Sequence, residues 1–164
     1  MTVLKLVPHN SPILKEKTPE FDFANPSTDP IQLARDLADT MLHHNGMGLA
    51  ASQIGLPIRA FTINSHPNIY CMFNPRIVNT SEVTVDLEEG CLSFPGLYIK
   101  VTRPKDVKIR FQVPTGDTQT QTFTGITARA ILHETDHLNG IIFLNHISRL
   151  KRDMAMKKYL KGKK

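Results

Sequence analysis

Apolar positions along the chain predict a helix that begins shortly after residue 29. They recur at the three- and four-residue spacing that places side chains on one face of a helix. Asp29 and Pro30 supply an N-cap and a proline in the first turn. The run His-His-Asn-Gly at 43–46 ends the helix, and we expect Gly46 to be its C-cap. The buried face consists of Ala34, Leu37, Ala38, Met41 and Leu42.

The middle of the chain changes to the alternating and β-branched pattern of strands, separated by turn-forming residues. A second helix fits residues 126–138, and Ser148 caps a third, basic helix that runs toward Lys161. A helix, a block of antiparallel strands and a helix packed against them predict an α+β fold. The predicted strands are residues 59–63, 69–78, 82–87, 97–101, 107–113 and 119–123.

Length and composition limit the remaining possibilities. A chain of 164 residues forms one domain, and four prolines make its first 29 residues an extended wrapping segment. No apolar run approaches the roughly 20 residues of a membrane-spanning helix, so we expect no membrane partner. The N-terminus shows no signal-peptide pattern, which makes the cytoplasm the expected compartment. In that reducing environment we do not expect Cys71 and Cys91 to form a disulfide.

Positive charge is concentrated at the C-terminal end. The chain carries a net charge of +5, whereas residues 149–164 hold eight Lys or Arg and one acidic residue, a net charge of +7. Residues 1–148 are therefore close to neutral, at −2. We divide the chain into this body and the basic helix or tail at 149–164. Such a tail is either a solvated terminus or an electrostatic contact for RNA or another polyanion.

The sharpest chemical signal is the sequence His133-Glu134-Thr135-Asp136-His137, an H-E-x-x-H on the second predicted helix. Histidines four residues apart lie on one helix face, so two imidazole nitrogens can bind one metal ion. The glutamate can then act as general base on a water molecule whose pKa the metal lowers from about 15.7 toward about 7. A chance match on a surface helix is the alternative, and the apolar flanks Ile126, Ala130 and Ile131 disfavour it.

A third metal ligand must come from elsewhere in the chain. Metzincins place a histidine three residues after the glycine, where this chain has Phe143, and no glutamate follows Glu134. Asp153 lies in the basic tail, and His146 falls just beyond the helix end. Cys91 is the best remaining candidate, because it follows a strand in a turn bounded by Gly90 and Pro95. For Cys71, within an apolar stretch, we prefer a buried structural position.

A third feature is the small-residue segment 46–55, Gly-Met-Gly-Leu-Ala-Ala-Ser-Gln-Ile-Gly. Three glycines and two alanines let the backbone approach a ligand or another segment closely. Gln53 offers an amide that can donate to a developing oxyanion. A helix cap followed by tight packing would explain the same residues, so this segment is weak evidence when taken alone.

The segments 46–53, 89–93 (Glu-Gly-Cys-Leu-Ser) and 133–137 resemble, in order and separation, the three motifs of the peptide deformylases. The whole chain is similar to that family. The resemblance implies antiparallel β-sheets packed around a central H-E-x-x-H helix, with an N-terminal helix and a short C-terminal helix, and a catalytic domain over 1–148. It implies a hydrolase that removes the N-formyl group from newly synthesised formyl-methionyl polypeptides and releases formate. It also implies one divalent metal ion per chain, Fe²⁺ in the cell, with Zn²⁺, Ni²⁺ or Co²⁺ as alternatives.

The resemblance also implies roles for residues at matching positions. Cys91, His133 and His137 would bind the metal, and Glu134 would move the proton. The Gln53 side chain and the Leu92 backbone N–H would stabilise the oxyanion. The Gly48 backbone would pair with a substrate that lies like an added strand. Residues near the pocket for the substrate's methionine are Met47, Ile126, Arg129 and Ala130.

Two further matches concern the surroundings of the metal. Glu89 and Arg103 would form an ion pair that braces the cysteine turn, and Asp136 would orient the ligands. The basic tail would contact ribosomal RNA, in a bacterium or a phage-infected cell. Two other functions stay open on the residues alone. One is a small metallopeptidase that cleaves unformylated peptides; the other is an inactive ribosome- or RNA-binding module with a structural metal.

Overall fold

The computed structural model describes residues 1–163; Lys164, part of the basic tail, lies outside the described residues. Three α-helices are present: α1 (Pro30–His43), α2 (Gly125–Leu138) and α3 (Arg149–Gly162). Three short 3₁₀ turns are η1 (Pro12–Lys15), η2 (Ala51–Ile54) and η3 (Phe143–His146). The strands are β1 (Gly48–Ala50), β2 (Ala60–Ser65), β3 (Asn68–Thr80), β4 (Thr84–Cys91), β5 (Phe94–Pro104), β6 (Asp106–Gln112) and β7 (Thr118–Thr124).

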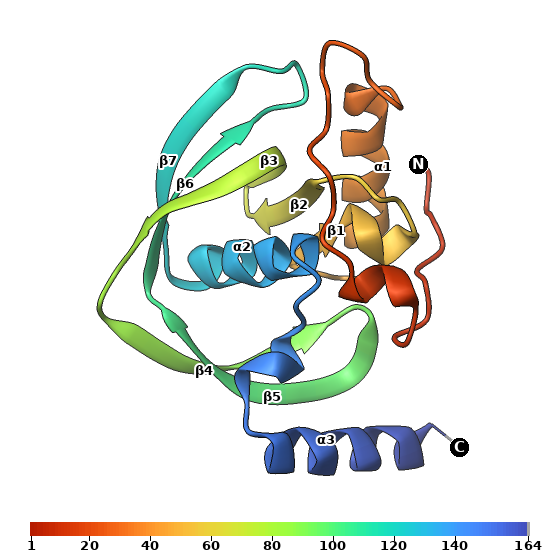
Figure 1. Ribbon diagram of the computed structural model, residues 1–164, viewed down its shortest axis with the longest axis vertical. Coiled ribbons are helices and arrows are strands. Elements are labelled where there is room, and N and C mark those ends of the chain that lie inside the picture. The colour runs from red at the N-terminus through yellow and green to blue at the C-terminus, as the bar shows by residue number, and fades with distance from the viewer. Residues whose placement is uncertain (164) are drawn as a thin grey trace.

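The strands form two antiparallel sheets around a central helix. Five strands pair in the order β1-β2-β3-β6-β7, and β4 and β5 form a separate hairpin. Helix α2 lies in the middle, with β6 and β7 to its left and the hairpin below it (Figure 1). This arrangement confirms the predicted α+β fold, in which antiparallel sheets surround the H-E-x-x-H helix.

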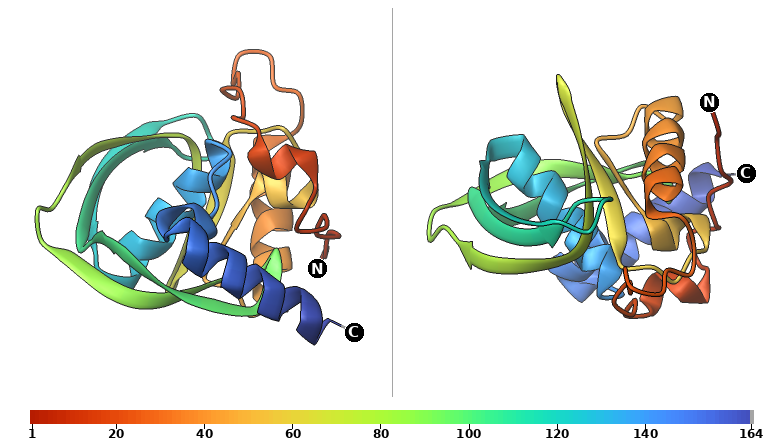
Figure 2. Two further views of the ribbon diagram at one scale, coloured as in Figure 1. Left: turned by 60° about the horizontal axis from the view of Figure 1, so that its bottom comes forward. Right: turned by 90° about the horizontal axis from the view of Figure 1, so that it is seen from above.

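Alternation along the strands explains why α1 and α2 pack on opposite faces of the large sheet. Phe61 on β2 and Met72 on β3 belong to the core shared with α2, whereas their neighbours Ala60 and Phe73 belong to the core shared with α1. Successive residues of a strand point to opposite faces, so each strand serves both cores. The view from above separates the two helices in this way (Figure 2).

The two predicted N-caps, Asp29 and Ser148, are confirmed. The Asp29 carboxylate accepts hydrogen bonds from the backbone of Ile31 and Gln32, and the Ser148 hydroxyl accepts one from Lys151. The first helix ends at His43, within the predicted run, but its C-cap is His44 and not the predicted Gly46. Asn45, with φ of 56°, takes the left-handed position, and the Gly46 N–H reaches back to the Met41 carbonyl. Asparagine tolerates this conformation better than most residues because its side chain bonds locally.

The short strand β1 is missing from the sequence-based prediction, which assigned no strand to the small-residue segment 46–55. Gly48 pairs with Ile63 and Ala50 with Phe61, so the segment completes one edge of the five-stranded sheet. Three residues are too few for an alternating pattern to be recognised. The other predicted strands are all present, with ends that differ by a few residues.

The first 29 residues wrap around the rest of the molecule, as predicted. The backbone amides of Leu4 and Val7 donate to the Thr40 hydroxyl and the Gln53 carbonyl. Further along, the Thr18 N–H donates to the Leu138 carbonyl at the end of α2. Within residues 1–163, every helix is too short or too polar to span a membrane.

Candidate metal centre

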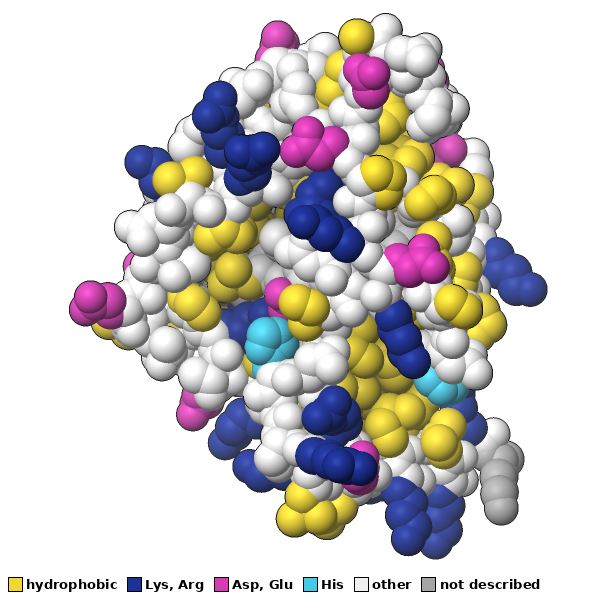
Figure 3. Space-filling view, in the orientation of Figure 1, with side chains coloured by type: hydrophobic (Ala, Val, Ile, Leu, Met, Phe, Trp, Pro, Cys, Tyr) yellow, Lys and Arg dark blue, Asp and Glu magenta, His cyan; other side chains and the backbone are white. Residues whose placement is uncertain are grey.

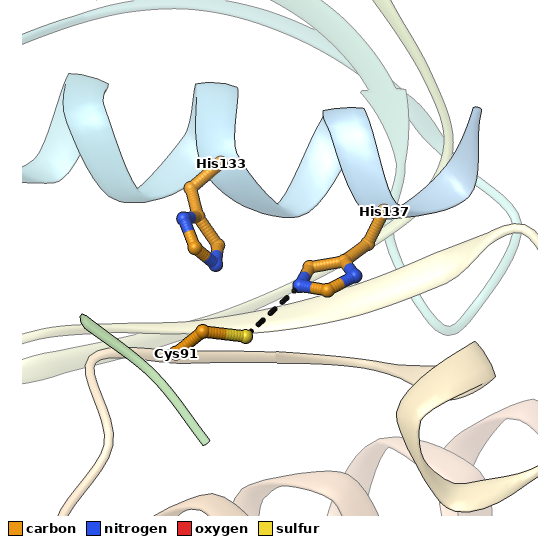
Figure 4. A group of neighbouring side chains, drawn as sticks. All are labelled: Cys91, His133 and His137. Carbon is orange, nitrogen blue, oxygen red and sulfur yellow. Dashed lines mark hydrogen bonds between the residues drawn. The ribbon is translucent and has the colours of Figure 1, made fainter. Parts of the chain in front are cut away.

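Two histidines and one cysteine meet beneath α2. His133 and His137 lie one turn apart on the same helix face, and both rings point down toward Cys91 at the end of β4 (Figure 4). The Cys91 Sγ and His137 Nε2 atoms are 3.3 Å apart, and one donor atom from each of the three residues lies within 4.8 Å of the others. The structure therefore brings together the three predicted ligands, as the H-E-x-x-H spacing requires.

The hydrogen-bonding pattern of His133 fits a metal ligand. Its Nδ1 lies 2.9 Å from Glu89 Oε1, a buried carboxylate on the hairpin. A histidine that donates its Nδ1–H to a carboxylate leaves Nε2 as the nitrogen that a metal ion can bind in place of a proton, and this nitrogen faces the cluster. Cys91 supplies a sulfur and His137 a second Nε2, a donor set that suits zinc, iron, nickel or cobalt. The residues present thus fit a divalent cation.

Charge at the cluster leads to the same conclusion. Burial lowers the pKa of His133, but hydrogen bonds with Cys91 and Glu89 and the charge of Glu134 outweigh burial and raise it well above the ordinary value. Burial and the neighbouring His133 together lower the pKa of His137 well below the ordinary value. The anionic groups around the cluster therefore favour one positive charge among them, which a bound cation supplies.

Glu134 is a buried carboxylate next to the cluster. Burial is the main reason that its pKa rises to about 7. One carboxylate oxygen, Oε2, has no hydrogen-bond partner among the described residues, and the other lies 3.9 Å from His133 Nε2. A carboxylate of this kind can accept a proton near neutral pH.

Gly48 explains why the segment 46–55 needs small residues. A Cβ atom at Gly48 would lie 2.8 Å from Glu134 Cγ and 2.9 Å from its Oε1, closer than real Cβ contacts. A Cβ at Gly46 would lie 2.7 Å from Leu92 Cδ1. Strand β1 and the residues just before it can approach the Glu134 carboxylate and the cysteine turn this closely because both positions lack side chains.

Gln53 is held with its amide nitrogen toward the cluster. Its Oε1 accepts a hydrogen bond from the Ala50 N–H at 2.9 Å. Its Nε2 lies 3.0 Å from the Ser93 hydroxyl and 3.6 Å from Cys91 Sγ. The structure therefore places the predicted amide donor, which is on η2, beside Cys91. The backbone carbonyl of Gln53 accepts a hydrogen bond from the Val7 N–H.

A cavity of about 840 Å³ opens beside the cluster. All five residues predicted near the substrate line it, as do the predicted Leu92, Glu134, Cys91 and His133. Met47 and Ile126 remain 47% and 57% exposed, so their apolar side chains are free to contact a ligand. The walls of the cavity come from β1, the β4–β5 hairpin and α2. The five residues predicted near the substrate are Met47, Gly48, Ile126, Arg129 and Ala130.

The predicted ion pair between Glu89 and Arg103 is confirmed, and it is buried. Both side chains are about 5% exposed or less, and the Arg103 Nε and Nη2 atoms donate to the two carboxylate oxygens. Burial would raise the pKa of Glu89, but hydrogen bonds from His133 and Arg103 outweigh it and lower the pKa to about 2. Asp136 continues this network through Arg103 Nη1, at 2.9 Å, and His146 Nε2, at 2.7 Å.

Several residues at the site were not predicted. Ser93 bonds to Gln53, and Tyr98 and Leu87 line the cavity with 65% and 42% of their surface exposed. Ser93 lies within one of the three motifs, so that motif could have indicated it. Leu87 on β4 and Tyr98 on β5 belong to no motif, and only the folded hairpin brings them to the cavity.

Comparison with known proteins agrees with this geometry. Residues 3–153 match the family described as polypeptide deformylase. A peptide deformylase from Agrobacterium fabrum is 36% identical over 99% of this chain and 97% of its own length, and one from Brucella suis is 43% identical over 79% and 77%.

Solved structures give the same result. A peptide deformylase from Legionella pneumophila superposes with a TM-score of 0.90 at 33% identity, covering 99% of this chain and 96% of that one. The Ehrlichia chaffeensis peptide deformylase in complex with actinonin superposes with a TM-score of 0.89 at 34% identity, covering 99% and 98%. The chain therefore belongs to the polypeptide deformylase family, metal-dependent hydrolases that remove the N-formyl group from newly synthesised polypeptides.

Proposed function

We propose that this chain carries out the deformylase reaction at the cluster beneath α2, with Cys91, His133 and His137 as the ligands of one divalent metal ion. This assignment rests on one observation: three donor atoms lie within 4.8 Å of one another, beside a buried carboxylate oxygen of Glu134 that has no hydrogen-bond partner within residues 1–163. When bound, the metal lowers the pKa of water and polarises the formyl carbonyl.

Glu134 moves the proton in this proposal. Its carboxylate takes a proton from the attacking water and delivers it to the amine that leaves when the formamide C–N bond breaks. Formate and a free methionyl N-terminus are the products. The pKa of about 7 and the burial of the side chain suit a group that must both accept and donate near neutral pH.

Gln53 and Leu92 stabilise negative charge on the formyl oxygen. The Gln53 amide is already aligned, with its oxygen bonded to Ala50 and its nitrogen next to Cys91. The Leu92 backbone N–H follows Cys91 directly, in the turn between β4 and β5. Donors that are fixed before the reaction lose no energy in reorganising as the charge develops.

The substrate's backbone pairs with β1. Gly48 lies on β1, which is an edge strand because it pairs only with β2 in the described sheet. A peptide added as a further strand would place its first residue over Met47, Ile126 and Ala130 and the stem of Arg129. Apolar side chains of moderate size suit the flexible thioether of methionine.

We take Fe²⁺ as the physiological metal, since a cysteine and two histidines accept it, with Zn²⁺, Ni²⁺ or Co²⁺ as substitutes. Formylated chains arise on bacterial-type ribosomes, so we place the enzyme in the cytoplasm of a bacterium or a phage-infected cell. The bacterial sources of the similar proteins support this location.

The decisive experiment is anaerobic turnover of formyl-Met-Ala-Ser by protein reconstituted with Fe²⁺. We expect rapid formate release from the formyl peptide and none from the acetyl or unmodified peptide. Cleavage of an internal bond in the unmodified peptide would favour a metallopeptidase. Absence of any turnover by fully metallated protein would favour an inactive RNA-binding module.

The variant Glu134→Gln tests the general base. We expect turnover to fall at least about a hundredfold, because positioned general bases contribute at least that much. Metal content should stay near one ion per chain, since Glu134 is not among the three ligands. Atomic absorption on the same preparation checks this, and an active Glu134→Gln protein would refute the assignment.

We further propose two functional parts, a catalytic domain at 1–148 and a basic tail at 149–164 that contacts ribosomal RNA. Lys and Arg side chains gather at the lower end of the molecule, over α3 (Figure 3), and several of them, including Lys151, Lys157 and Lys158, are exposed. Removing exposed Lys and Arg charges should weaken ribosome co-sedimentation and flatten its salt dependence.

The tail test uses Lys151→Gln combined with Lys157→Gln and Lys158→Gln, and Lys5→Gln as an exposed control outside the tail. Deformylation of short peptides should be unchanged in both proteins. Equal co-sedimentation of the triple variant and the control across salt concentrations would refute the contact.

A further inference from the structure

Arg129 lies one helical turn before His133 on α2, and its side chain is 10% exposed. Its guanidinium reaches three acceptors. Nη1 donates to Glu89 Oε2 at 2.6 Å and to the Val101 carbonyl at 2.8 Å, and Nη2 donates to the Val85 carbonyl at 2.6 Å. The charged end of Arg129 is therefore engaged with protein groups, and the stem is the part that can form the cavity wall.

The three acceptors all belong to the β4–β5 hairpin. Val85 and Glu89 are on β4, and Val101 is on β5. A two-stranded hairpin is marginally stable by itself, so it depends on contacts with the rest of the molecule. This hairpin ends its first strand at Cys91, whereas the other two ligands are on α2. The distance between cysteine and histidines thus depends on how the hairpin is held against α2.

Glu89 receives charged donors from both sides. Arg103 is on β5, so its bonds to Glu89 stay within the hairpin. Arg129 and His133 both come from α2, and each takes one of the two carboxylate oxygens. An arginine has the planar, forked set of donors that can bond several acceptors at once.

We propose that Arg129 is a positioning residue for the metal centre. Its guanidinium fixes Glu89 and the hairpin against α2, which orients His133 and keeps Cys91 in place beside His137. This inference rests on the proposed ligand set and adds to it a residue that binds neither metal nor substrate through its charge. Groups that orient metal ligands from outside tune both metal affinity and activity.

The test compares Arg129→Met, Arg129→Lys and the matched control Arg76→Met. Methionine keeps an apolar stem of similar length and removes the guanidinium, and lysine keeps the charge without the fork. Arg76 is 76% exposed on β3 and contacts only the exposed Glu20 in its ion pair. Zn²⁺ affinity is measured by competition with a chelator, the Co²⁺ protein by its visible absorption spectrum, and deformylation by kcat and KM.

We expect Arg129→Met to bind Zn²⁺ about tenfold more weakly, the lower end of the range for groups bonded directly to a ligand. The Co²⁺ spectrum should shift and kcat should fall while KM changes little. In Arg129→Lys the Zn²⁺ affinity and kcat should lie between those of Arg129→Met and the wild type. If Arg129→Met does not fold, Arg129→Lys is the variant that tests the inference. Arg76→Met should match the wild type.

The inference would be overturned if the Zn²⁺ affinity and the Co²⁺ spectrum were unchanged in Arg129→Lys and in a folded Arg129→Met. A rise in KM alone would show that Arg129 only lines the cavity. Wild-type protein that bound no metal would overturn the proposed centre together with this inference. Metal binding by the wild type with unaffected variants would leave the centre standing and remove only the role of Arg129.

Discussion

The two cysteines of this chain show how position decides the chemistry of one residue type. Cys71 lies on β3, paired with Thr62 of β2, and burial raises the pKa of its thiol to about 12. Cys91 lies at the end of β4, facing two histidines across the metal centre. The raised pKa keeps the partly buried first cysteine as an unreactive thiol, whereas we propose the second as a metal ligand.

Alkylation with iodoacetamide should distinguish these thiols. At pH 8 a thiol with a pKa of about 12 is ionised in about one molecule in ten thousand, so Cys71 should react only after unfolding. Cys91 should be protected in the metal-loaded protein and should react once a chelator has removed the metal. Mass spectrometry of tryptic peptides reads both sites. Equal labelling of Cys91 with and without metal would contradict its place among the ligands.

Among the elements, helix α2 is stabilised by contacts at its C-terminal end. Arg59 donates to the Leu138 carbonyl at 3.0 Å and to Asn139 Oδ1 at 2.8 Å. A cation at the end of a helix is favourable because the last carbonyls carry partial negative charge. Immediately after it, Gly140 has a φ of 73°, and a Cβ there would lie 2.5 Å from the Lys15 carbonyl oxygen. The N-terminal segment can cross the helix end only at a glycine.

Gly140→Ala should therefore lower the free energy of unfolding by at least about 2 kcal/mol. The left-handed conformation alone costs a residue with a side chain about 1–2 kcal/mol, and the backbone clash adds to it. Gly162→Ala is the matched control, because no described atom lies within 4 Å of a Cβ at that position in α3. Urea unfolding measures both. A Gly140→Ala protein as stable as Gly162→Ala would show that the N-terminal segment can move away without cost.

At the scale of the whole molecule, Glu89 connects the parts that make the site. Its carboxylate joins β4 to Arg103 on β5 and to Arg129 and His133 on α2. Its pKa of about 2 in the folded protein compares with an ordinary value of 4.5. A carboxylate with a lowered pKa stabilises the folded state above its unfolded pKa, and the stabilisation is lost as the pH falls toward the folded pKa.

The pH dependence of stability should report this network. The difference in unfolding free energy between wild type and Glu89→Gln should be about 3 kcal/mol larger at pH 6 than near pH 2, because each unit of pKa shift corresponds to about 1.4 kcal/mol. Most of the loss should occur between about pH 4.5 and about pH 2. Metal-depleted protein is used, since acid also displaces metals from their ligands. A difference that stayed constant from pH 6 to pH 2 would contradict the proposed linkage.

The sequence by itself determined most of the elements, with β1 as the exception, and indicated much of the proposed chemistry. A prediction from sequence succeeds where one segment contains all the residues on which the predicted feature depends. Asp29 with Pro30 and Ser148 begin helices, and the four-residue spacing of His133 and His137 puts both on one helix face. Cys91 followed from eliminating other ligands and from the resemblance of three motifs to one family. None of these inferences needed to know which strand lies beside which.

Tertiary structure decided everything that depends on distant segments meeting. Gly48 belongs to a small-residue segment in the sequence, and only its approach to Glu134 explains why no side chain fits there. Arg129 appears as a pocket residue, and only the folded hairpin supplies the acceptors for its charge. The physical reason is the same in both cases. A steric limit or a buried charge is a property of two surfaces in contact, and the order of residues along one segment does not contain the second surface.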